Sequence, residues 1–231
     1  MKYLALLRKE IRECLPWAMT AAGILFIFGF YKTVSPDLRQ VYLISWDENP
    51  GSFIKNDNAF FTDTSVRDVG PLLLAVSYGL GIALAVRQFW FAHFTKTWPF
   101  LLHRSISRFK LLWVKITAAV FFLFVPILGI WTLLFLYACF VRDFPPPPTF
   151  RIWLEGLFFI TLGAVLYLAA AVSFMLPTRW YTTRFFPVLF AFLGINLAFS
   201  PLPLPYLFLF IAILCLYLGT MLFAEFKYRV F

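Results

Sequence analysis

Residues 111–141 read LLWVKITAAVFFLFVPILGIWTLLFLYACFV, and they are the strongest indication of the fold class of the chain. Its only charged residue is Lys115, near its beginning. A helix rises roughly 1.5 Å per residue, so about 20 apolar residues are enough to cross the hydrocarbon core of a bilayer. The stretch therefore predicts a transmembrane helix long enough to tilt or to project beyond the membrane, with a kink near Pro126 and Gly129.

Similar apolar runs lie on both sides of this stretch. Hydrophobic residues make up 62% of the 231 residues and charged residues 13%, which is more apolar material than a water-soluble domain of this length can bury. The fold class that follows is all-α: a polytopic membrane protein with a single transmembrane domain over residues 1–231 and six transmembrane helices. The predicted spans are about 16–34, 70–92, 111–141, 152–176, 185–200 and 204–224.

An amphipathic segment, residues 1–15, precedes the first span. Leu4, Leu7 and Ile11 recur at helical spacing, while charged residues occupy the other side. We expect this segment to lie in the membrane interface as an elbow helix, and we expect Pro16 to end it. The basic residues assigned to the interfacial elbow are Arg8, Lys9 and Arg12.

Basic residues gather in one set of connections between the predicted spans. Of the 20 lysines and arginines, 14 lie in the N-terminal segment, in the connection from Arg87 to Lys115, in residues 177–184 or at the C-terminus. The other connections hold 8 of the 11 acidic residues. By the positive-inside rule, both termini and the loop 93–112 are predicted to be cytoplasmic and the loop 32–69 to lie outside. The expected location is a plasma or inner cell membrane.

The residue content argues against several functions. The net charge of +9 comes from short loops rather than from a basic stripe, so lipid headgroups and not nucleic acid are the expected partners. Cys14, Cys139 and Cys215 are scattered and predict neither a disulfide framework nor a zinc site. No hydrolase, metalloprotease or phosphate-loop motif occurs, so no catalytic, cofactor-binding or metal residue is assigned.

Ionisable residues are few within the predicted spans and lie near their ends. Arg87, Glu155 and Glu225 are interpreted as interface anchors. Because no carboxylate is expected to be buried in the membrane, any transport is expected to be independent of proton or sodium gradients. The energy for transport would then come from another source.

Two stretches resemble motifs of one membrane family. LLRKEIRE, residues 6–13, is similar to the cytoplasmic elbow helix of type-two ABC transporter permeases, the group that includes multidrug and polysaccharide exporters. TWPFLLHRSISRFKLLWVK, from Thr97 to Lys115, resembles the pattern that follows the second span of those permeases. The chain departs from the family at Arg87, Gln88 and Lys96, since the family usually has an acidic residue upstream and a glycine before the threonine.

The resemblance implies the membrane-spanning permease subunit of an ATP-driven ABC exporter, which is not itself an enzyme. ATP and Mg would bind to a separate ATPase subunit, because this chain has no phosphate-binding loop. Two permease chains, as a homodimer or a heterodimer, would assemble with two ATPase chains, and residues 93–112 would form the coupling loop. The residues expected to dock the ATPase are Trp98, Phe100, Leu101, Leu102, Arg104 and Arg108.

Two other classes of function stay open. A non-transporting membrane scaffold or assembly factor would have a similar composition but no ATPase partner. An integral membrane enzyme acting on lipids would need polar residues that converge at one membrane depth. The acidic residues of 32–69 are interpreted instead as part of a solvated loop, because basic residues accompany them.

Overall fold

The computed structural model describes residues 2–34, 69–95, 107–140, 150–175, 186–198 and 203–228, and these ranges are almost entirely helical. No strand occurs in them, so the all-α prediction is confirmed for the described residues. The elements are α1 (Lys2–Val34), α4 (Gly70–Ala85), the π-helical turn η1 (Val86–Trp90), α5 (Phe91–Phe94), α7 (Arg108–Phe140), α8 (Phe150–Met175), α10 (Phe186–Ala198) and α11 (Leu204–Tyr228).

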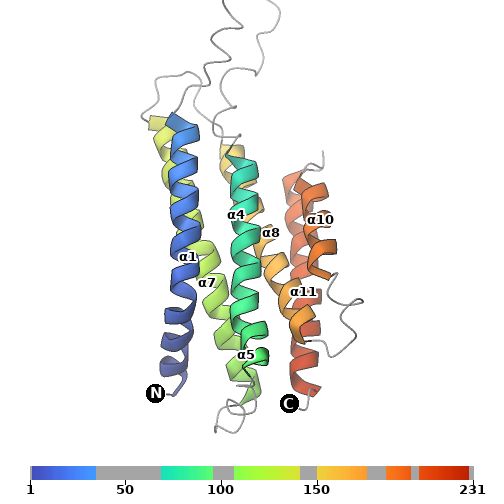
Figure 1. Cartoon of the computed structure of the whole chain (residues 1–231). Coiled ribbons are helices and arrows are strands. Elements are labelled where there is room, and N and C mark those ends of the chain that lie inside the picture. Colours follow the sequence, from blue (N-terminus) through green and yellow to red (C-terminus); the bar gives the residue numbers. More distant parts are fainter. Residues whose placement is uncertain are drawn as a thin grey trace, which may run out of the picture.

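The helices stand side by side in one bundle. α1 begins and α11 ends at the same end of this bundle, which is called the terminal end below (Figure 1). α8 is the central helix, because it packs against α4, α7, α10 and α11, whereas α1 packs against α7 and α4. Within the most apolar 18-residue stretch of α8, 67% of the residues are buried inside the protein. The corresponding share in α11 is 22%. The core therefore runs along α8.

Within the described ranges, five helices are long and apolar enough to cross a membrane: Leu4–Thr33, Gly70–Trp90, Phe109–Phe140, Phe150–Met175 and Leu204–Lys227. Their outward faces carry large apolar side chains, such as Ile27 (65% exposed), Leu133 (62%) and Leu216 (69%). Water-soluble proteins rarely expose such side chains over a continuous surface. The surface is thus compatible with a multi-pass membrane protein.

The first helix differs from the prediction. The sequence predicts that Pro16 ends an elbow helix, but α1 is one helix of 33 residues with Pro16 inside it. Buried side chains follow helical spacing on both sides of the proline, from Leu6 and Cys14 to Ala18 and Leu25. Packing against α7 and α4 therefore continues past Pro16 and offsets the backbone hydrogen bond that proline removes. The predicted break is wrong, and a separate elbow helix is not confirmed.

α10 occupies the predicted fifth span, 185–200, but it is short. Its 13 residues extend about 20 Å at 1.5 Å per residue, less than the roughly 30 Å of a hydrocarbon core. α10 packs against α8, and the Tyr78 hydroxyl of α4 donates a hydrogen bond of 3.3 Å to the Ala191 carbonyl. A helix is present where one was predicted, but six full spans are not confirmed.

α4 and α8 approach closely because small residues face each other. A Cβ atom on Gly81 would lie 2.5 Å from the carbonyl oxygen of Gly163. A Cβ atom on Gly163 would lie 2.7 Å from the carbonyl oxygen of Ser77. The missing side chains therefore set the separation of the two helices. This contact also brings η1, at the end of α4, beside α8.

Candidate functional site

A buried ion pair joins α1 to α7 near the terminal end. Lys115 Nζ lies 2.8 Å from Glu10 Oε1, and the two side chains are only 4% and 6% exposed. Glu10 lies on the buried stripe of α1 between Leu6 and Cys14. Charged side chains are almost never buried this fully unless they are paired. This pair is the centre of the buried polar cluster, which consists of Glu10, Cys14, Gln88, Lys115 and Tyr167.

Gln88 connects the ion pair to the end of α4. It lies in η1, where the backbone N–H of Phe91 bonds to the carbonyl of Val86. Lys115 Nζ donates a hydrogen bond of 3.1 Å to the Gln88 carbonyl, and Gln88 Nε2 donates one of 3.1 Å to the Lys115 carbonyl. π-Helical turns are rare and occur frequently at functional sites. Here the turn coincides with a reciprocal pair of hydrogen bonds to α7.

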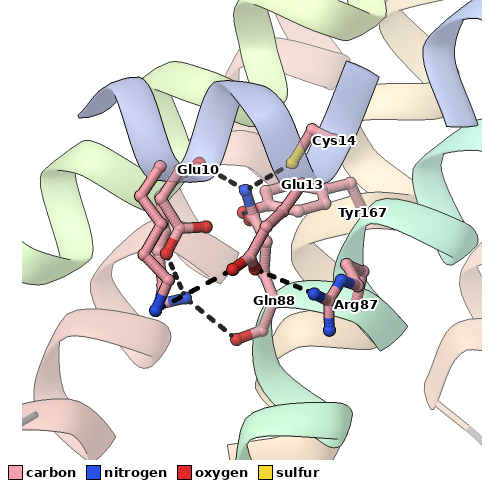
Figure 2. A network of polar contacts seen from close by, with 8 residues as sticks. Glu10, Glu13, Cys14, Arg87, Gln88 and Tyr167 are labelled. Atoms are coloured by element: carbon pink, nitrogen blue, oxygen red, sulfur yellow. Dashed lines mark hydrogen bonds and ion pairs between the residues drawn. The ribbon is translucent and has the colours of Figure 1, made fainter. Parts of the chain in front are cut away.

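The Gln88 side chain also contacts α8 and α1. Tyr167 Oη donates a hydrogen bond of 2.6 Å to Gln88 Oε1, and Gln88 Nε2 donates one of 3.4 Å to Cys14 Sγ. Figure 2 shows Cys14 and Tyr167 approaching Gln88 from different helices. Tyr167 is 2% exposed and Cys14 is fully buried. Gln88 is therefore the residue at which α1, α7, α8 and η1 meet.

Another ion pair lies at the rim of the cluster. Arg87 Nη2 is 3.1 Å from Glu13 Oε2 (Figure 2), and these side chains are 27% and 30% exposed. The Arg87 guanidinium carbon also lies 4.6 Å from the centre of the Phe91 ring. Because solvent screens a partly exposed pair, it holds the helices less strongly than the buried one. Arg87, predicted as an interface anchor, thus has an acidic partner on α1.

The buried carboxylate depends on its cation. Glu10 Oε2 is buried and has no hydrogen-bond partner within the described part of the chain. The Lys115 ammonium, which bonds the other oxygen, also lies 6.0 Å from the centre of the Phe89 ring. A buried carboxylate with one unsatisfied oxygen relies on the charge beside it, because the desolvation of the carboxylate is otherwise uncompensated.

The arrangement of these groups is that of a connection between helices. An ion pair, an amide, a phenol and a thiol form fixed hydrogen bonds across four helical elements. Among the described residues, no group of three or more His, Cys, Asp or Glu side chains comes together as a metal site would require. The cluster is suited to carrying a displacement of one helix to the others.

The structure describes only part of the predicted site. Arg8, Lys9 and Arg12 are exposed on α1, on the charged side of that helix. Arg108 begins α7, but its side chain is not among those described. The other predicted docking residues lie outside the described residues: Trp98, Phe100, Leu101, Leu102 and Arg104.

Glu10, which the sequence places in the amphipathic segment before the first predicted span, is buried in the protein and only 5% exposed. Leu6, Glu10 and Cys14 follow one another at four-residue spacing, which is as compatible with one face of a helix as the three- and four-residue spacing of Leu4, Leu7 and Ile11. Leu4 itself is 68% exposed. The sequence analysis counts Lys115 among the basic residues of the connection that begins at Arg87, whereas the structure buries it within α7. Independence from proton and sodium gradients stays a prediction, because the buried Glu10 carboxylate is already paired with the Lys115 ammonium.

No protein-family model, no curated protein and no solved structure matches the chain. The resemblance to ABC transporter permeases therefore depends on residues 6–13, on residues 97–115 and on the predicted topology. The geometry around these two stretches is the remaining guide to function, and the buried polar cluster includes Glu10 from the first and Lys115 from the second.

Proposed function

We propose that the chain is the membrane-spanning permease subunit of an ATP-driven ABC exporter, with a separate ATPase bound at the terminal end. The observation that carries this proposal is the position of the helices that flank residues 96–106. α5 precedes this segment, α7 follows it, and α5 and the beginning of α7 lie at the terminal end (Figure 1). A partner that docks between them would act directly on helices joined by the buried polar cluster.

Docking is assigned to the coupling loop, residues 93–112. Its apolar side chains would fill a groove on the ATPase, and its arginines would pair with carboxylates at the rim of that groove. The planar guanidinium group suits such two-point contacts. The residues proposed for docking are Trp98, Phe100, Leu101, Leu102, Arg104 and Arg108.

The proposed assembly has two permease chains and two ATPase chains in a plasma or inner cell membrane. The terminal end faces the cytoplasm, where ATP and Mg bind to the ATPase subunits. The exposed apolar faces of the long helices contact lipid or the second permease chain, and the substrate moves along the path between the permeases. The excess of basic residues in the connections assigned to the cytoplasm supports this orientation.

The test is to purify the tagged full chain from its native membranes in mild detergent. We expect a second polypeptide to co-purify, to be photolabelled by azido-ATP and to hydrolyse Mg·ATP in a vanadate-sensitive way. Leu101→Ala combined with Arg104→Glu should reduce the amount of this polypeptide by about 30-fold or more. The loss of a desolvated charge contact costs about 2–5 kcal/mol, and 1.4 kcal/mol is roughly a factor of ten.

Arg151→Glu is the matched control, because it reverses an exposed positive charge at the opposite end of the bundle. We expect this variant to keep the ATPase. If the wild-type chain brings down no ATP-binding polypeptide, the proposal is wrong and a non-transporting scaffold becomes the better interpretation. If the coupling-loop variant retains the ATPase, the docking surface lies elsewhere.

A further inference from the structure

We propose that Glu10, Gln88 and Lys115 are positioning residues that carry movement of the coupling loop into α1 and α8. This inference rests on the proposed function, since it supplies the route from a docked ATPase to the membrane-spanning bundle. The buried polar cluster joins η1, which precedes the coupling loop, to α7, which follows it. The same cluster also contacts α1 and α8.

The two sides of the coupling loop are fastened to each other. Gln88 and Lys115 are 27 residues apart in sequence, and the segment 96–106 lies between them. The two hydrogen bonds between them, each 3.1 Å long, both end on backbone carbonyls. Because backbone carbonyls move with their helices, η1 and the beginning of α7 cannot separate without breaking both bonds.

Glu10 adds α1 to this unit. The Lys115 ammonium lies between the Glu10 carboxylate, at 2.8 Å, and the Gln88 carbonyl, at 3.1 Å. The second carboxylate oxygen has no hydrogen-bond partner in the ranges that the structure describes. A displacement of Lys115 therefore acts on α1 through this short, buried contact as well as through the packing of α7 against α1.

Tyr167 adds α8, the central helix. Its hydroxyl donates to Gln88 Oε1 at 2.6 Å. α4, which continues directly into η1, is itself in backbone contact with α8 at Gly81 and Gly163. Such close packing leaves little freedom for the two helices to move separately, so a shift of η1 is passed along α8.

A purely stabilising role would not require charges at this position. Apolar side chains of similar volume often stabilise a protein interior as well as a buried ion pair does, or better. Here a buried pair with an unsatisfied oxygen is joined to a π-helical turn. The fixed directions of an ion pair and its hydrogen bonds hold a geometry that apolar packing does not specify.

The experiment uses the purified complex of the full chain with its ATPase. Cys139→Ala and Cys215→Ala remove the partly exposed thiols, while Cys14 is fully buried and stays in place. Leu4→Cys, at a position 68% exposed on α1, carries a fluorescent label. We expect Mg·ATP with vanadate to change the quenching of this label by a water-soluble quencher. Glu10→Leu combined with Lys115→Met should abolish the change while the ATPase still co-purifies.

Glu155→Gln is the control, because it removes an exposed ion pair at the other end of α8 and should leave the change intact. Glu10→Gln combined with Lys115→Gln, which removes both charges and keeps polar side chains, should also lose the change and serves if the first double variant does not insert. If the change persists without the Glu10–Lys115 pair, or if a wild-type complex shows none, this inference is wrong and the proposed function stands. If no ATPase binds the wild-type chain, both are wrong.

Discussion

Glu10 and Lys115 carry opposite charges into a region where, apart from the other members of the buried polar cluster, the buried side chains are mostly apolar. Removing one partner leaves a buried charge uncompensated, which costs about 3–5 kcal/mol of unfolding free energy, whereas replacing both by apolar groups is often neutral or stabilising. Glu10→Leu alone and Lys115→Met alone should therefore lower the unfolding temperature of the purified chain in detergent. The double variant should recover most of the loss.

Lys9→Met is the matched control on the same helix. Lys9 pairs with Glu13 at 3.8 Å and its side chain is 57% exposed, so its removal should change the unfolding free energy by about 1 kcal/mol or less. A double variant whose loss equals the sum of the two single losses would show that Glu10 and Lys115 do not act as a pair.

At the scale of the elements, the contact between α4 and α8 depends on two glycines. Gly163→Ala would place a Cβ atom 2.7 Å from the Ser77 carbonyl oxygen and 2.9 Å from Ser77 Cβ, so the helices must separate. Such overpacking costs about 1–3 kcal/mol. We expect a lower unfolding temperature for this variant. Gly79→Ala is the control on α4, since nothing lies within 4 Å of its Cβ position, and equal losses in both variants would contradict the contact.

The continuity of α1 is also testable through Pro16. A proline inside a helix costs about 3 kcal/mol relative to alanine, and Pro16 is exposed within α1. Pro16→Ala should therefore raise the unfolding temperature, because the restored N–H group completes the helix. The neighbouring exposed residue Leu15 supplies the comparison, since Leu15→Ala should give no such gain. An unchanged or lower stability for Pro16→Ala would favour a break at this residue.

At the scale of the whole molecule, the charge distribution predicts orientation. Residue 104 and both termini should be cytoplasmic, and residue 57 should lie outside. Basic residues gather at the termini and in the loop 93–112, which the positive-inside rule places in the cytoplasm. Single cysteines introduced in a cysteine-free background can be labelled by an impermeant thiol reagent in intact cells. We expect labelling at position 57 and none at position 104. The reverse pattern would overturn the orientation.

The positions of most helices can be predicted from the sequence, because hydropathy and helical periodicity are local properties. Residues 116–141 contain no charged residue and predict a helix, and the structure has α7 over Arg108–Phe140. The predicted spans 70–92, 152–176 and 204–224 also correspond to described helices. Their ends shift by a few residues because helix termini depend on neighbours as well as on local composition.

The buried face of α1 and the partner of Glu10 depend on tertiary packing and cannot be predicted from local sequence. Several sets of residues in α1 have helical spacing, so the sequence does not show which set is buried. The buried set is the one that faces α7 and α4. Glu10 and Lys115 are 105 residues apart, so no local pattern predicts that they pair. The same packing carries α1 past Pro16, because contacts between distant segments outweigh the local preference of one residue.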